Sequence, residues 1–142
     1  MQTREQDNRP EIETTKQLAA LRQIGAAIEH FHKQEFECVI TLAAAAECLL
    51  PPTDGPHLFR QIRGRMTSTE FKKINLNFLV NWLKQDDPED PESVVISEFE
   101  AVIALQRAIM KFIAVYHKSS TGMEEFLAWA RSNDYSAPRP MS

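Results

Sequence analysis

The sequence has few glycines, few cysteines and no long uncharged runs, and each of these features argues against a class of protein. Of its 142 residues, 4 are Gly and 2 are Cys. Two cysteines exclude a small secreted scaffold built on disulfides, and so few glycines leave little material for loops that cradle phosphate groups. The longest uncharged apolar stretch, residues 38–46, is about half the length of a membrane-spanning helix. We therefore expect no membrane-spanning segment.

The start of the chain and its charge balance indicate where the protein is located and what it does not bind. The first 17 residues contain one aliphatic residue, Ile12, and so lack the apolar region of a secretory signal. We expect a cytoplasmic protein. Against 16 Lys and Arg stand 20 Asp and Glu, a formal net charge of −4. This balance argues against a protein that coats nucleic acid through phosphate contacts, although a local basic patch is compatible with it.

Proline and polar clusters divide the chain into one domain with two tails. Residues 1–10 and 135–142 are polar or proline-bearing, and we expect both to be flexible tails. Residues 11–134 form a single domain, long enough to bury a core without a metal or a disulfide. Within the domain, helices cannot continue through the proline clusters at 51–56 and 86–91.

Between these breaks the hydrophobic spacing is helical, and no stretch alternates with a period of two. Capping signals mark three possible helix starts: Thr67 with Glu70, Ser97 with Glu100, and Thr121 with Glu124. The sequence predicts an all-α, up-and-down bundle of about five helices, with helices over about 12–33, 36–50, 67–85 and 94–118 and a last one after 121. The Ala43–Ala46 run predicts a close approach of two helix backbones.

The predicted helix over 94–118 is apolar around most of its circumference. Glu100, Arg107 and Lys111 form its narrow polar stripe, whereas Gln106 and His117 project into the apolar arc. Such a helix lies at the centre of a bundle or covers a partner subunit as well as its own core. We expect both, and hence a homodimer through this helix.

The segment LAALRQIGAAIEHFHKQEFECVITLAAAAECLL, residues 18–50, resembles the opening helical hairpin of the HEPN superfamily (higher eukaryotes and prokaryotes nucleotide-binding domain). The resemblance rests on an Ala-rich first helix, a short polar connection before Phe36, and an Ala-rich second helix with Glu47 near its end. It implies an all-α up-and-down bundle, frequent dimerisation, and often a role beside RNA in toxin–antitoxin or antiviral systems. It covers about a quarter of the chain.

The sequence departs from the motif of HEPN ribonucleases, which is Arg, four to six residues, and then His on a late helix. Its nearest pair, Arg107 and His117, has nine intervening residues. Ten helical steps separate such a pair by about 15 Å along the axis. We therefore expect a non-enzymatic interaction module, with a protein or RNA partner. The alternative is a divergent, metal-independent ribonuclease that uses Arg107 and His117 at a dimer interface.

Residues 57–73 hold the main concentration of positive charge. Arg60, Arg63 and Arg65 lie within it and could bind phosphate or nucleic acid, with Arg60 and Arg63 one helical turn apart. The alternative is a solvated loop, or a neutralising partner for the acidic run at 86–92.

The remaining candidates concern metals. Glu29 and His32 have the Glu-x-x-His spacing of ligand pairs in helical bundles, which gives a ligand- or metal-binding bundle as a third hypothesis. Such a site needs a second Glu-x-x-His, which the sequence lacks, so we expect no metal and no cofactor. Cys38 and Cys48 lie ten residues apart among apolar residues and are predicted to be small core residues.

Overall fold

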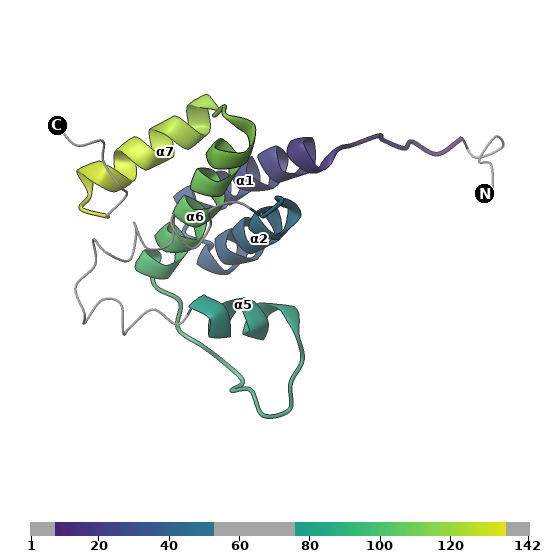
Figure 1. Ribbon diagram of the computed structural model, residues 1–142. Helices are drawn as coiled ribbons and strands as arrows, with labels where there is room; N and C mark the ends of the chain where they lie inside the picture. The colour runs from purple at the N-terminus through teal and green to yellow at the C-terminus, as the bar shows by residue number, and fades with distance from the viewer. Residues whose placement is uncertain (1–7, 53–75, 136–142) are drawn as a thin grey trace.

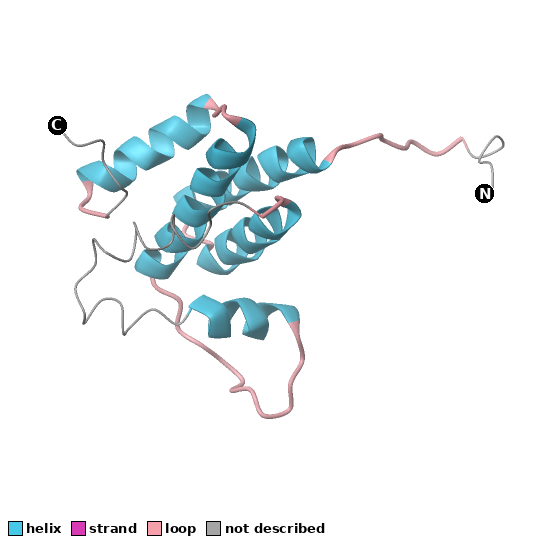
Figure 2. Ribbon diagram, in the orientation of Figure 1, coloured by secondary structure: helices cyan, strands magenta, loops and turns pink. Residues whose placement is uncertain are grey.

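A computed structural model describes residues 8–52 and 76–135. In these ranges the chain forms helices joined by loops and contains no strand (Figures 1 and 2). The prediction of an all-α helical bundle is confirmed. The five helices of the described residues are α1 (Lys16–His32), α2 (Phe36–Leu49), α5 (Leu76–Lys84), α6 (Glu98–Tyr116) and α7 (Thr121–Ser132).

Helices α1 and α2 form the predicted hairpin. The hydroxyl of Thr15 accepts a hydrogen bond from the backbone N–H of Leu18, so α1 begins at Lys16 rather than near residue 12. The connection turns at Gln34, which has a φ of 60°. The Gln34 and Glu35 amides donate to the carbonyls of Phe31 and His30, the pattern of a Schellman motif. Glycine normally takes this left-handed position, and here a chain poor in glycine uses glutamine.

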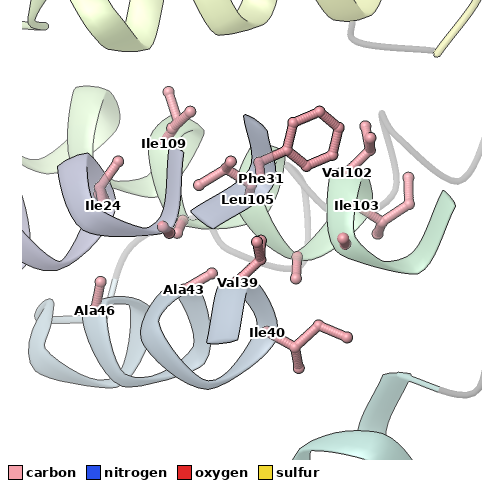
Figure 3. Close-up of a cluster of buried hydrophobic side chains, with 14 of the residues drawn as sticks. Ile24, Phe31, Val39, Ile40, Ala43, Ala46, Val102, Ile103, Leu105 and Ile109 are labelled. Atoms are coloured by element: carbon pink, nitrogen blue, oxygen red, sulfur yellow. The ribbon is translucent and has the colours of Figure 1, made fainter. Parts of the chain in front are cut away.

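The core lies where α1, α2 and α6 meet (Figure 3). Figure 3 shows Val39, Ala43 and Ala46 pointing from α2 toward the other two helices. Ala43 and Ala46 are completely buried, whereas Ala45 is exposed. The small side chains at the buried positions are compatible with the close backbone approach that the sequence predicts.

Helix α6 is the central element of the bundle. It packs against α1, α2 and α7, and every residue from Glu100 to Gln106 is buried. Since seven consecutive residues cover all sides of a helix, the chain itself covers this part of α6 completely. Its N-terminus carries the predicted capping box of Ser97 and Glu100, so the helix begins at Glu98 rather than near residue 94.

Helices α5 and α7 flank this centre, with α5 packed on α2 and α7 on α1 and α6 (Figure 1). The rings of Phe126 and Trp129 on α7 pack against Phe31 of α1, with centroids 5.2 and 5.1 Å away. Ser120, rather than the predicted Thr121, caps α7 by accepting from the Met123 amide.

The chain after α7 turns at Asp134 and stays packed. Tyr135, the first residue of the predicted C-terminal tail, stacks on Trp129 at 5.7 Å and donates a hydrogen bond to Glu98. The other predicted tail residues with a described structure, residues 8–10, are exposed. The predicted cap of Thr67 and Glu70 lies outside the described residues. None of the helices in the described part of the chain is long and apolar enough to span a membrane.

Candidate functional site

The most distinctive group of polar side chains lies where α6 passes the end of α2. Arg107 and Lys111 stand four residues apart on α6, and side chains at this spacing share one side of a helix. Both contact Glu47 of α2. Nη2 of Arg107 lies 3.0 Å from the Glu47 carboxylate oxygen Oε2, and Nζ of Lys111 donates to the Glu47 backbone carbonyl at 3.1 Å. Two cations therefore converge on one residue.

These contacts have a structural effect on α2. The last carbonyls of a helix have no partner within the helix and carry the negative end of its dipole. The Glu47 carbonyl accepts from the Leu50 amide at 3.3 Å and also from Lys111, and Arg107 places a second positive charge beside it. The side chains of Arg107 and Glu47 are each 27% exposed, so water screens their ion pair only in part. The cluster fastens α2 to α6.

A cavity of about 210 Å³ opens beside this cluster, between α2, α5 and α6. We call it the α2–α5–α6 cavity. Its polar lining comes from Glu47, Arg107 and Lys111 together with Cys48 and Asn77, and its apolar lining from Ala44, Leu76, Val80 and Ala104. Among the described residues that line it, the two cations and one carboxylate sum to a formal charge of +1. Such a cavity suits an anionic group with a small apolar part.

The structure separates the two residues of the ribonuclease hypothesis. Arg107 lies midway along α6 and lines the cavity, whereas His117 is the residue that follows the helix, is exposed, and does not line the cavity. His117 has a φ of 55°, a left-handed conformation that ends α6. Within one chain, the ten-residue separation is thus kept and the pair does not form one site.

Two other predicted groups do not form a site in the described residues. Glu29 and His32 are both exposed on α1, and in ranges 8–52 and 76–135 no three His, Cys, Asp or Glu residues gather as metal ligands. The neighbouring His30 pairs instead with Glu35, its Nδ1 lying 2.8 Å from Oε1. Arg60, Arg63 and Arg65, with the whole basic segment 57–73, lie outside the described residues.

The prediction that the cysteines are core residues was wrong. Cys38 is partly exposed and Cys48 is exposed, and both are free thiols. The spacing explains the error, because the buried face of α2 carries Val39, Ala43 and Ala46 and leaves both cysteines off it. Partial burial, with the carboxylates of Glu37 and Glu35, raises the pKa of the Cys38 thiol.

A larger cavity, about 500 Å³, lies between the end of α5 and the loop that follows it. The Trp82 indole N–H donates to the Pro91 carbonyl at 2.8 Å and holds this loop against the helix. The lining is rich in carboxylates, from Asp86, Asp87, Asp90 and Glu92. A group of carboxylates without a further feature does not define a ligand.

Sequence reasoning did not identify the α2–α5–α6 cavity, although it identified its parts. Arg107 and Lys111 stood out as a polar stripe on an otherwise apolar helix, and Glu47 as an acid on an Ala-rich one. Their convergence depends on how α2 and α6 pack, which the spacing within either helix does not encode. Comparisons of the chain with family models, with curated proteins and with solved structures give no match.

Proposed function

We propose that the protein is a non-enzymatic helical interaction module that holds an anionic group of its ligand in the α2–α5–α6 cavity. The observation that carries this proposal is the convergence of two cations on Glu47 at the cavity, Arg107 on its carboxylate and Lys111 on its backbone carbonyl. A helix end is stabilised by one nearby cation. Lys111 contacts a neutral carbonyl, and its positive charge at the cavity is therefore available to a ligand.

The test is to titrate the protein with sulfate, phosphate and acetate at constant ionic strength and to follow backbone amides by two-dimensional NMR. At least one anion should shift amides that line the cavity, such as those of Ala44 and Ala104. Lys111→Gln should abolish these shifts, because it removes one of the two cations. Lys118→Gln, which removes an exposed cation just past α6, is the matched control and should bind as the unmodified protein does.

Absence of a saturable shift with every anion would refute the proposal, and so would unchanged binding in Lys111→Gln. Circular dichroism of each variant establishes that the helices are retained. A folded Lys111→Gln protein that no longer binds thus supports the cavity as the site.

The ribonuclease hypothesis is the second candidate, because Arg107 does line the cavity. Within one chain His117 lies apart from it, so this activity requires residues of a second subunit. Incubation with RNA, using the unmodified protein, Arg107→Ala and His117→Ala, separates the candidates. We expect no cleavage by any of them. Cleavage that His117→Ala abolishes would replace the non-enzymatic proposal.

The wider setting that we propose rests on the resemblance and on the sequence. A HEPN-like module of this kind would work in the cytoplasm as a homodimer, beside a protein or RNA partner in a bacterial-type toxin–antitoxin or defence system. The homodimer was inferred from the apolar surface of residues 94–118. Because α6 is covered from Glu100 to Gln106 by its own chain, a dimer through this helix has to use its C-terminal turns.

A further inference from the structure

The α2–α5–α6 cavity has features that distinguish between anions. We infer that its occupant is a monocarboxylate with a short aliphatic group, either a free acid or the C-terminal residue of a polypeptide. This inference rests on the proposed function, since it names the ligand class of the same site. Three features of the cavity carry it: the charge, the apolar wall, and the carboxylate that already lies there.

The charge favours a monoanion. Among its described lining residues, Arg107, Lys111 and Glu47 sum to a formal charge of +1, and a carboxylate brings that sum to zero. A phosphate dianion would reverse its sign beside the Glu47 carboxylate. Lys111 has three N–H donors, one of which is given to the neutral Glu47 carbonyl. The ammonium charge is therefore not balanced by this contact and can be shared with an incoming carboxylate.

The apolar wall favours an aliphatic group of limited size. Leu76 and Val80 of α5 face the cavity together with Ala44 and Ala104. Pockets for drug-sized ligands span about 300–1,000 Å³, and this cavity, at about 210 Å³, is smaller. A side chain of three or four carbons attached to a carboxylate would cover the wall, and inorganic phosphate would leave it in contact with water.

Glu47 is an internal competitor for the same cation. The Glu47 carboxylate contacts Arg107 in the way that a ligand carboxylate would. The side chains of Glu47 and Arg107 are each 27% exposed. Partly exposed pairs of this kind are weak, so an incoming carboxylate can share or replace the contact at small cost. Removing the negative charge of Glu47 should therefore strengthen carboxylate binding.

The experiment compares isobutyrate, acetate and phosphate in NMR titrations at equal ionic strength and pH. We expect isobutyrate to bind more tightly than acetate, and both to bind more tightly than phosphate, at the amides that line the cavity. Val80→Thr, which keeps the shape of the side chain and replaces one methyl with a hydroxyl, should weaken isobutyrate binding and leave acetate binding unchanged. Stronger binding of phosphate than of both carboxylates would overturn the inference while leaving the proposed anion site standing. Failure of all three anions to bind would refute both.

The internal competitor is tested by Glu47→Gln, with Glu37→Gln, an exposed position on the same helix, as the matched control. Glu47→Gln should tighten isobutyrate binding about fivefold, the effect of a weak charge interaction, and Glu37→Gln should not change it. Unchanged or weaker binding in a folded Glu47→Gln protein would overturn the competitor role. A valine-terminated tetrapeptide and its C-terminal amide distinguish the two sources: binding of the acid alone supports a polypeptide ligand, and binding of isobutyrate with neither peptide supports a free acid.

Discussion

Gln106 places a primary amide in the centre of the bundle. Its side chain is completely buried on α6, and neither Oε1 nor Nε2 has a hydrogen-bond partner among the described residues. Burying an amide without a partner costs stability. Gln106→Met keeps the length of the side chain and removes both polar atoms, so we expect the free energy of unfolding to rise by about 1 kcal/mol. Urea unfolding followed by circular dichroism measures it.

The matched control is Gln85→Met at an exposed position, where the expected change is within about 0.5 kcal/mol. A clear loss of stability in Gln106→Met would show that the buried amide makes a favourable contact. If Gln106→Met is more stable, as we expect, selection for stability alone does not explain the glutamine at this position.

Tyr135 couples the end of the chain to α6 through its hydroxyl. Burial, the hydrogen bond to Glu98 and the charge of Glu98 all raise the pKa of Tyr135. The unfolded chain then loses this proton, at a pH near 10, before the folded protein does. The free energy of unfolding contributed by Tyr135 is therefore fully present below pH 10 and falls as the pH rises above it.

Tyr135→Phe should lower the free energy of unfolding at pH 8 by about 1 kcal/mol, since it removes one hydrogen bond to a charged acceptor. It should also lessen the decline of stability between about pH 9 and 11. Urea unfolding across this range measures both effects. Tyr116→Phe removes a phenol hydroxyl at another position and is the control. An identical decline in Tyr135→Phe and the unmodified protein would contradict the coupling.

At the scale of the helix, α2 shows how small residues set the distance to its neighbours. Ala46 is completely buried and the adjacent Ala45 is exposed. Ala46→Leu adds three carbons where no space exists, so we expect a loss of about 1–3 kcal/mol in the free energy of unfolding. Ala45→Leu makes the same chemical change in solvent and should alter stability little. Equal effects of the two substitutions in urea unfolding would show that Ala46 does not set the helix spacing.

The helices were predictable because their spacing is a local property. The apolar steps of α1 and α2 and the capping box of Ser97 with Glu100 each depend on residues within a few turns. The first turn of α1 was placed too early, because Ile12 fits the spacing although it is 78% exposed, and Thr15 provides the stronger start signal. The cysteines were misplaced because an apolar neighbourhood in sequence does not say which side of a helix is buried.

The candidate site could be predicted only in parts. Arg107 and Glu47 are 60 residues apart in sequence, and their contact follows from the packing of α2 on α6. Periodicity assigns each residue to a side of its own helix and gives no register between helices. The apolar surface of α6 was correctly predicted to need a cover. In the described part of the chain, α6 packs against α1, α2 and α7.

At the scale of the whole molecule, the charge distribution bears on what the protein can bind. The chain has a formal charge of −4, yet the α2–α5–α6 cavity is formally positive. A net negative charge repels polyanions at long range, whereas a positive cavity attracts a small anion at short range. The proposed small carboxylate is therefore compatible with a chain of net negative charge.

The proposed homodimer also belongs to this scale. The C-terminal turns of α6 keep apolar surface in contact with water, since Met110 and Ile113 are partly exposed and Ala114 is exposed. A standard interface buries about 800 Å² on each partner, so a stable dimer needs these turns and surface from neighbouring elements. Sedimentation velocity at micromolar concentration should give a species of twice the 16.2 kDa chain mass.

Ala114→Arg should shift this species toward the monomer, because it places a long charged side chain at the centre of the proposed contact. Ala45→Arg, the same substitution at an exposed position of α2, should leave the dimer intact. If the unmodified protein is a monomer, the homodimer hypothesis is refuted, and so is the ribonuclease hypothesis that needs residues from two subunits. This result would leave the cavity untouched, since Arg107, Lys111 and Glu47 all come from one chain. Dissociation by Ala45→Arg but not by Ala114→Arg would instead move the interface to the outer face of α2.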